Sequence, residues 1–190
     1  MKPGDHPEFF RFPAPEGRSR ESTIRLDGEG RFHHDGELVE HGKLADAMHR
    51  WISRHPDDGR YILTNGYDWT YFTVDDAPYI VRSLRATDDG DVLLLLSDGT
   101  EEPWEPETTR IGAEDALYAR VKAGARGGPF DAKFSRHAQL ALAPLLVADE
   151  PAGRAGQVEA GQAEEREGGA PAAKTPCVRV RGRVVPFRAA

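Results

Sequence analysis

Alternating apolar and polar residues in the middle of the chain predict a central β-hairpin. Within residues 60–82, apolar side chains recur at every second position on either side of a turn. Asn65-Gly66 supplies residues that reverse the chain readily. The second strand, residues 69–74, carries large side chains on both of its faces, so both faces are expected to be covered. We therefore expect this hairpin to lie inside a sheet and not at its edge.

Two other segments have the period of an amphipathic helix. Apolar side chains recur at spacings of three and four in residues 42–54 and again in residues 133–147. Pro144 marks the last turn of the second helix or a kink in it. The apolar positions are Leu44, Ala47, Met48, Trp51 and Ile52 in the first helix, and Phe134, Ala138, Ala141, Leu142, Leu145 and Leu146 in the second.

The order of these elements repeats along the chain. Strands precede each helix and a hairpin follows it, at residues 61–74 after the first helix and at residues 177–187 after the second. The helices coincide when Leu44 is placed on Ala138, a shift of 138 − 44 = 94 positions. We therefore predict an α+β fold of duplicated ββαββ units, with mainly antiparallel sheets and two main helices. The alternative to duplication is convergence on a common α+β pattern.

Two segments lack the pattern of a packed element. Residues 1–21 hold four prolines among charged residues and predict an extended arm. Its aromatic residues Phe9, Phe10 and Phe12 predict contact with an apolar surface of the same domain, or else a motif that docks a partner. Residues 149–175 contain almost no large apolar side chain, so they predict a disordered insert.

The rest of the chain divides around these two segments. Residues 22–86 hold the first ββαββ unit and the strand after it. Residues 87–148 hold a connecting hairpin and the start of the second unit, and residues 176–190 form its closing hairpin. The C-terminus is therefore expected to belong to the core.

Composition and charge narrow the class of protein. Charged residues make up 30% of the 190 residues and apolar residues 38%, as in globular proteins. The formal net charge of −7 argues against a general affinity for nucleic-acid backbone or anionic membrane. The single cysteine, Cys177, excludes an intramolecular disulfide. Without the apolar core of a signal peptide or a membrane span, the sequence predicts a cytoplasmic protein.

Several short motifs resemble one bacterial family. The motifs are Asp27–Val39, Asp58–Thr64, Val74–Val81, Leu117–Val121 and Phe130–Arg136. In this order they are similar to the DUF1285 family of proteins of unknown function, over about residues 20–148 and the final hairpin. The resemblance implies a doubled ββαββ arrangement and a role in small-molecule binding or signal transduction, with no established activity. The proline-rich arm and the insert depart from the family pattern.

The end of the central hairpin is the candidate site. Asp75 and Asp76 are adjacent carboxylates, which can serve as acid and base when their environments differ. The same residues are also typical of a strand exit with a side-chain-to-backbone turn. Tyr79 and Arg82 follow on the next strand. We predict Asp75, Asp76, Tyr79 and Arg82 as ligand-binding residues and predict no catalytic residue.

Other polar clusters carry weaker signals. His33 and His34 would lie on opposite faces of a strand, and no acidic residue completes a ligand spacing with them, so we predict no metal and no cofactor. Arg179, Arg181 and Arg183 form a small basic strip on the last hairpin. This strip pairs with acidic neighbours or binds an anionic ligand or RNA.

Three functions follow from these features. The first is a non-enzymatic binding module that holds a small-molecule or anionic ligand where the units meet and has a signalling or regulatory role. The second is a hydrolase-like enzyme that uses Asp75 or Asp76 as general base. The third is an interaction scaffold whose protein partner binds the N-terminal arm or residues 149–175. Membrane and nucleic acid are disfavoured as partners.

Overall fold

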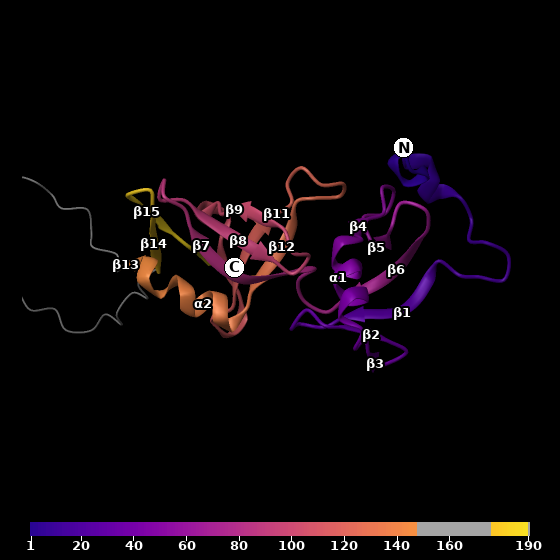
Figure 1. Cartoon of the computed structure of the whole chain (residues 1–190), viewed down its shortest axis with the longest axis horizontal. Helices are drawn as coiled ribbons and strands as arrows, with labels where there is room; N and C mark the ends of the chain where they lie inside the picture. Colours follow the sequence, from indigo (N-terminus) through magenta and orange to yellow (C-terminus); the bar gives the residue numbers. More distant parts are fainter. Residues whose placement is uncertain (148–175, 190) are drawn as a thin grey trace, which may run out of the picture.

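Two lobes follow one another along the long axis of the molecule (Figure 1). The computed structural model describes residues 1–147 and 176–189, and the disordered insert predicted at residues 149–175 lies outside them. The first lobe contains β1 to β6 and α1, and the second begins at β7 (Figure 1). Over the described ranges, every helix is too short or too polar to cross a membrane.

The first lobe is built on a six-stranded sheet with the order β3-β2-β1-β6-β5-β4. Its strands are β1 (Glu21–Leu26), β2 (Phe32–His34), β3 (Glu37–Leu38), β4 (Ile52–Arg54), β5 (Tyr61–Thr64) and β6 (Trp69–Val74). The central strands β1 and β6 run parallel, and the other neighbours are antiparallel. The hairpin β5–β6 therefore lies inside the sheet, as the apolar side chains on both of its faces predict.

The second lobe contains a seven-stranded and a three-stranded sheet, ordered β16-β10-β11-β12-β7-β8-β9 and β13-β14-β15. The strands of the larger sheet are β7 (Tyr79–Ala86), β8 (Val92–Leu96), β9 (Glu101–Pro103), β10 (Arg110–Ile111), β11 (Leu117–Val121), β12 (Phe130–Phe134) and β16 (Arg188–Ala189). Those of the smaller sheet are β13 (Leu146–Val147), β14 (Cys177–Val180) and β15 (Arg183–Pro186). β7 and β12 run parallel, as β1 and β6 do in the first lobe.

The strand orders of the two lobes match, which confirms the α+β fold with a duplicated unit. β1 to β6 and β7 to β12 are arranged in the same sequence across their sheets. In this correspondence α1 (Gly42–Arg50) connects the third and fourth strands of the first lobe, where the second lobe has the 3-10 helix η3 (Pro106–Thr108). α2 (Arg136–Leu142) follows the second sheet. α1 and α2 therefore do not occupy equivalent positions in the two repeated units. This differs from the predicted alignment, which places the first helix on the second by a shift of 94 positions.

Polar side chains begin both helices. The Nδ1 atom of His41 accepts a hydrogen bond from the Leu44 N–H at 3.2 Å at the start of α1. Ser135 Oγ accepts one from the Ala138 N–H at 3.1 Å at the start of α2. These caps satisfy N–H groups that have no partner within a helix, which fixes where each helix begins.

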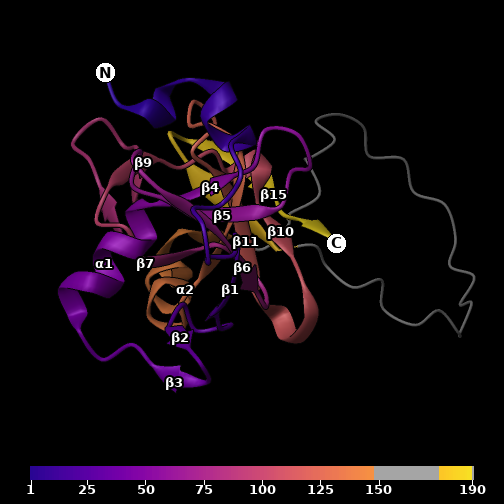
Figure 2. The same cartoon turned by 90° about the vertical axis from the view of Figure 1, so that its right-hand side faces the viewer.

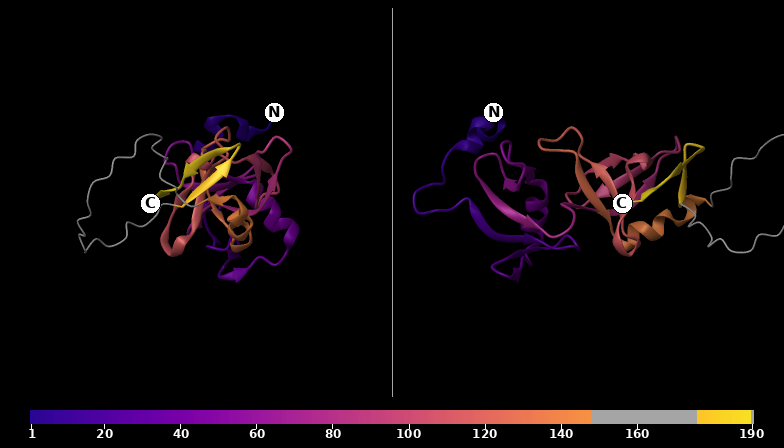
Figure 3. Two further views of the ribbon diagram at one scale, coloured as in Figure 1. Left: turned by 90° about the vertical axis from the view of Figure 1, so that its left-hand side faces the viewer. Right: turned by 180° about the vertical axis from the view of Figure 1, so that it is seen from behind.

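The closing hairpin β14–β15 packs at the end of the second lobe, next to α2. Figure 3 shows this hairpin in yellow beside the orange helix. β14 pairs with β13, which follows α2 and the 3-10 helix η5 (Ala143–Leu145), and not with β11 or β12. Val178 and Phe187 of this segment are buried in the main core. The C-terminal segment up to Phe187 thus contributes to the core, as its sequence predicts.

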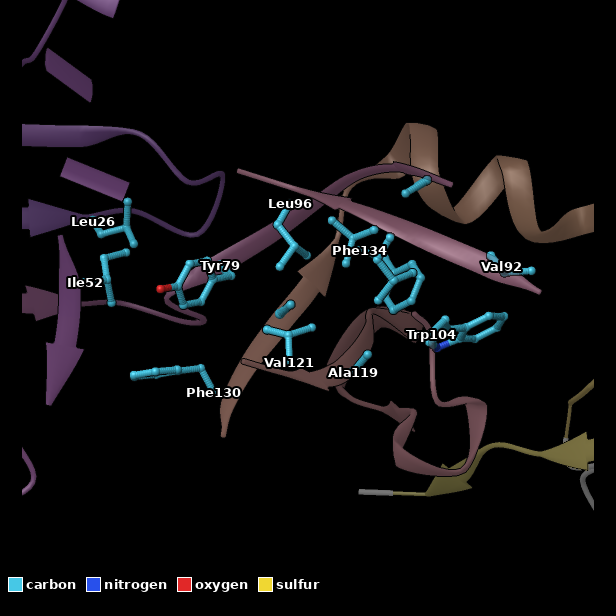
Figure 4. Close-up of a cluster of buried hydrophobic side chains, with 14 of the residues drawn as sticks. Leu26, Ile52, Tyr79, Val92, Leu96, Trp104, Ala119, Val121, Phe130 and Phe134 are labelled. Carbon is cyan, nitrogen blue, oxygen red and sulfur yellow. The ribbon is translucent and has the colours of Figure 1, made fainter. Parts of the chain in front are cut away.

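One hydrophobic core extends through both lobes. Leu26 and Ile52 of the first lobe belong to the same buried cluster as Tyr79 and Phe130 of the second. Figure 4 shows these side chains at the junction, with the remaining core of the second lobe beyond them. Because burial of apolar surface is the main stabilising contribution in a folded domain, each lobe depends on the other for part of its stability.

The N-terminal segment packs on the first lobe as two 3-10 helices, η1 (Pro3–Asp5) and η2 (Pro7–Arg11). Phe10 is buried in a second apolar cluster with Ile62 and Trp69. Ile62 alternates along β5 with residues that face α1, so this cluster lies on the opposite face of the sheet. Figure 2 shows α1 and the N-terminal segment on different sides of the first-lobe strands. Phe12, in contrast, is 60% exposed.

The tight turn between β1 and β2 is organised by the carboxylate of Asp27. It accepts hydrogen bonds from the backbone N–H groups of Glu29 and Arg31, from Arg31 Nε at 2.9 Å, and it contacts His33 Nε2 at 3.0 Å. Burial opposes ionisation of this group, but the hydrogen bonds outweigh burial and lower the pKa of Asp27 to about 2.

Asp27→Asn is therefore expected to cost about 2 kcal/mol of unfolding free energy at pH 7, because each pKa unit corresponds to roughly 1.4 kcal/mol. The folded-state pKa is depressed, so this contribution is present above about pH 4 and is lost as the pH falls towards 2. Urea unfolding of both proteins from pH 7 to pH 2 measures the difference. If the difference in unfolding free energy between wild type and variant stayed the same from pH 7 to pH 2, this role of Asp27 would be contradicted.

Candidate functional site

The two aspartates of the predicted site point to different partners. Asp75 forms an ion pair with Arg25 of β1. Asp76 accepts hydrogen bonds from Lys133 Nζ at 2.7 Å and from the Tyr118 hydroxyl at 3.2 Å, both in the second lobe. Each carboxylate is thus neutralised by a separate cation, and neither lines a described pocket.

Tyr79 and Arg82 are three positions apart on strand β7, and their side chains have different surroundings. The Tyr79 side chain is buried at the lobe junction, 5.5 Å from the ring of Phe130. Burial, followed by the carboxylates of Asp98 and Glu102, raises the pKa of Tyr79. Arg82 is exposed and its guanidinium lies 3.7 Å from a carboxylate oxygen of Asp46 on α1. None of the four residues lines the three pockets described in this section and below, and their role in ligand binding stays a prediction.

An apolar pocket of about 280 Å³ lies in the first lobe between α1 and the sheet. α1 has only nine residues, so it leaves part of a six-stranded sheet uncovered on this face. Strand alternation directs Ile24, Leu63 and Thr70 towards this face. The pocket is lined by Ile24, His34, Val39, Leu44, Met48, Trp51, Leu63, Asn65, Asp68, Trp69 and Thr70.

The polar side chains of this pocket are mostly engaged by the protein. Asp68 Oδ1 accepts from Arg20 Nη1 at 2.6 Å and from the Trp69 N–H at 2.9 Å. Burial would raise the pKa of Asp68, but these hydrogen bonds lower it. Asn65 Oδ1 accepts from the backbone N–H groups of Tyr67 and Asp68, which leaves the Asn65 side-chain NH₂ as a donor towards a ligand. The pocket therefore offers apolar surface and a hydrogen-bond donor, and its one carboxylate is already neutralised.

The basic strip of the last hairpin meets acidic neighbours. Arg181 forms an ion pair with Asp91, and the Arg183 guanidinium lies 3.6 Å from a carboxylate oxygen of Glu107. Both arginines line a polar pocket of about 180 Å³ beside Trp104. These contacts correspond to the first of the two roles that the sequence suggests for the strip.

The histidines occupy separate environments. His33 contacts Asp27, whereas His34 is an exposed side chain at the pocket of the first lobe. His49 on α1 is buried, with Nε2 at 3.1 Å from the Gly30 carbonyl oxygen, and burial lowers its pKa. Within residues 1–147 and 176–189, no group of three or more His, Cys, Asp or Glu side chains is placed to hold a metal ion.

Comparison with known proteins shows a likeness of fold. The sequence matches no family model and no curated protein. A DUF1285 family protein from Silicibacter pomeroyi DSS-3 superposes with a TM-score of 0.58 and 16% sequence identity, over 94% of this chain and 92% of that chain. A DUF1285 family protein from Shewanella baltica OS155 has a TM-score of 0.49 and 16% identity, over 62% of this chain and 87% of that chain. The chain thus has the fold of the S. pomeroyi DUF1285 protein, in agreement with the resemblance found in its motifs.

Proposed function

We propose that this protein is a non-enzymatic binding module for a small, largely apolar molecule. The observation that carries the proposal is the pocket of about 280 Å³ between α1 and the first sheet, lined by Met48, Trp51 and Leu63 among others. Small-molecule sites are typically concave, mostly apolar and equipped with a few polar groups that orient the ligand. Asn65 supplies such a group here.

The surroundings of the two aspartates favour binding over hydrolysis. A general base must reach the proton of a substrate held in a pocket, and its pKa must suit the pH at which it works. Asp75 is paired with Arg25 and Asp76 with Lys133, and neither aspartate lines the apolar pocket of the first lobe. Because both aspartates at the end of β6 already have a cationic partner, we place the ligand in the first-lobe pocket and not beside them.

A regulatory output could be carried by the N-terminal segment. Trp69 borders the pocket at the start of β6, while its ring lies on the opposite face of the sheet and packs against Phe10 of η2 at 6.1 Å between ring centres. A ligand that displaces this end of β6 would alter the packing of Phe10 through Trp69, because closely packed groups move together. We propose this contact as the route from ligand binding to the protein surface.

A charged side chain placed in the pocket tests the proposal. We expect Leu44→Glu to weaken ligand binding about tenfold or more, because an apolar ligand would then lie against a carboxylate. Leu140→Glu is the matched control, since Leu140 is also an exposed leucine on a helix but lies outside the pocket. The readouts are a thermal-shift screen of metabolites, followed by titration of tryptophan fluorescence with each compound that raises the Tm.

The size of the expected signal can be stated in advance. A ligand at 100 times its Kd stabilises the folded state by about 2.7 kcal/mol, which for a chain of this length raises the Tm by roughly 5–10 °C. A screen in which no compound raises the Tm would count against the proposal. Equal loss of binding in Leu44→Glu and Leu140→Glu would place the ligand elsewhere.

A further inference from the structure

A second pocket of about 280 Å³ adjoins the apolar pocket of the first lobe. Trp51 and Asn65 line both pockets, so the two spaces meet at these side chains. The second pocket is lined by Lys2, Gly4, Asp5, Arg50, Trp51, Ile52, Ser53, Thr64, Asn65, Gly66, Ala125 and Arg126. It therefore lies where the N-terminal segment, the first lobe and the β11–β12 turn of the second lobe come together.

The charge of this second pocket is positive, although the whole chain is acidic. Lys2, Arg50 and Arg126 contribute three cations and Asp5 one anion, a local balance of 3 − 1 = +2 in a chain of net charge −7. Three cations from separate segments that converge on one concave space create a potential that attracts anions. A pocket of this kind favours a negatively charged group over a neutral or positive one.

The three cations still have hydrogen-bond donors to offer. Lys2 Nζ donates to the Asn65 carbonyl at 3.3 Å, and Arg126 donates to the Gly4 carbonyl. An ammonium has three donors and a guanidinium five, so most of their N–H groups are not used by these bonds. Arg50 has no ion pair or hydrogen bond from its side chain to any of the described residues. Its guanidinium is thus the freest positive group at the pocket.

We propose that the ligand is an amphipathic anion, with its apolar part against α1 and its carboxylate or phosphate group beside Arg50, Lys2 and Arg126. This inference rests on the proposed function and adds the chemical class of the ligand. The polar end is selected by charge-assisted hydrogen bonds, which are stronger than bonds between neutral groups. The apolar end is selected by burial against Trp51, Leu63 and Met48. A ligand with both parts would contact the N-terminal segment and both lobes at once.

A series of probes with one apolar chain and different head groups tests the inference. Octanoate, octyl phosphate, octanol and octylammonium are titrated separately into the full chain, with calorimetry and tryptophan fluorescence as readouts. We expect octanoate and octyl phosphate to bind about tenfold more tightly than octanol, and octylammonium to bind most weakly, because one charge-assisted contact corresponds to about a factor of ten. Raising the salt concentration should weaken only the two anions.

Arg50→Gln identifies the residue that recognises the head group. Arg50 is an exposed helix residue without a partner among the described residues, so its replacement should leave the fold intact. We expect Arg50→Gln to reduce octanoate affinity about tenfold towards that of octanol and to leave octanol binding unchanged. The control is Arg179→Gln, which removes the same charge from an exposed residue of β14 and should change neither affinity.

The possible outcomes separate this inference from the proposed function. Equal binding of octanol and octanoate, with both abolished by Leu44→Glu, would overturn the anion but keep the apolar site. Absence of binding for all four probes would overturn both. Co-sedimentation with phosphatidylserine vesicles, without binding of free octanoate, would also overturn the inference, because it would assign the basic residues to a bilayer surface. Loss of octanoate affinity in Arg50→Gln and not in Arg179→Gln would support it.

Discussion

Lys122→Met is expected to lower the free energy of unfolding by about 3–5 kcal/mol, the usual cost of removing one partner from a buried ion pair. Lys122 Nζ lies 2.7 Å from Asp98 Oδ2 and 3.1 Å from Glu102 Oε1. The side chains of Lys122 and Asp98 are only 13% and 6% exposed. The substitution would leave the Asp98 carboxylate buried with no cation beside it. Urea denaturation followed by circular dichroism measures the loss.

Acid should reduce this difference. Burial would raise the pKa of Asp98, but its hydrogen bonds with Lys122 and Thr100 lower it, so the wild-type pair stabilises the fold at neutral pH and loses this contribution as Asp98 is protonated. The matched control is Arg85→Met, which breaks an exposed pair with Glu101 and should cost less than about 1 kcal/mol. Equal effects of the two substitutions at pH 7 would show that the Lys122 pair is not a buried one.

Phe130→Ala is expected to lower the free energy of unfolding by about 3–5 kcal/mol as well, here through a cavity in the core. Phe130 is completely buried at the lobe junction, with its ring 5.5 Å from that of Tyr79 and 6.4 Å from that of Tyr61. Because Tyr61 belongs to the first lobe and Tyr79 to the second, the loss affects both lobes. The measurement is thermal unfolding with tryptophan fluorescence and calorimetry in parallel.

Unfolding of the two lobes is also expected to be cooperative. A core shared by both lobes predicts one cooperative transition for wild type and variant, seen equally by both probes. Phe12→Ala is the control, since this aromatic side chain is exposed and its removal should cost less than about 0.5 kcal/mol. Two separate transitions in the wild-type protein would show that the lobes are independent and that Phe130 does not join them.

Local sequence patterns predict which helices and strands form more accurately than they predict where each element begins and ends. The first helical segment was predicted to reach residue 54, but α1 ends at Arg50 and Ile52 enters β4. Ile52 is apolar and buried in both interpretations, so periodicity does not distinguish them. The second helix begins later than predicted, because residues up to Phe134 pair with β7 and β11. Its end agrees with Pro144, where the chain continues as the 3-10 helix η5.

The shared strand order of the two lobes could not be found from local patterns. β1 pairs with β6, and Leu26 lies opposite Val74, so the contact joins residues 74 − 26 = 48 positions apart. A parallel pair of this kind leaves no turn signal in the sequence, unlike a hairpin. The sequence pattern therefore aligns the two repeats through their helices, which have the clearest period. In the structure the repeated feature is the order of six strands across each sheet.

The candidate pocket depends on the same long-range relations. The sequence pointed to Asp75 and Asp76, since adjacent carboxylates suggest chemistry, but it could not show that Arg25 and Lys133 neutralise them. The strand predicted at Trp69 is present as β6, but the pocket beside α1 depends on the length of α1 relative to the sheet, which a local pattern does not contain. One signal was present in the sequence, namely the concentration of large aromatic side chains around Asn65-Gly66.

The β11–β12 turn covers an open sheet edge in the first lobe. β4 is an outer strand, and Arg126 of this turn accepts a hydrogen bond from Ser53 Oγ at 3.2 Å through its carbonyl oxygen. At Gly127, a Cβ atom would lie 2.6 Å from the Cβ of Arg54, and the backbone φ of +75° falls in the region that favours glycine. Unprotected outer strands can pair with other chains and start aggregation. The second lobe thus covers this outer strand of the first, and glycine at position 127 allows the turn to approach it so closely.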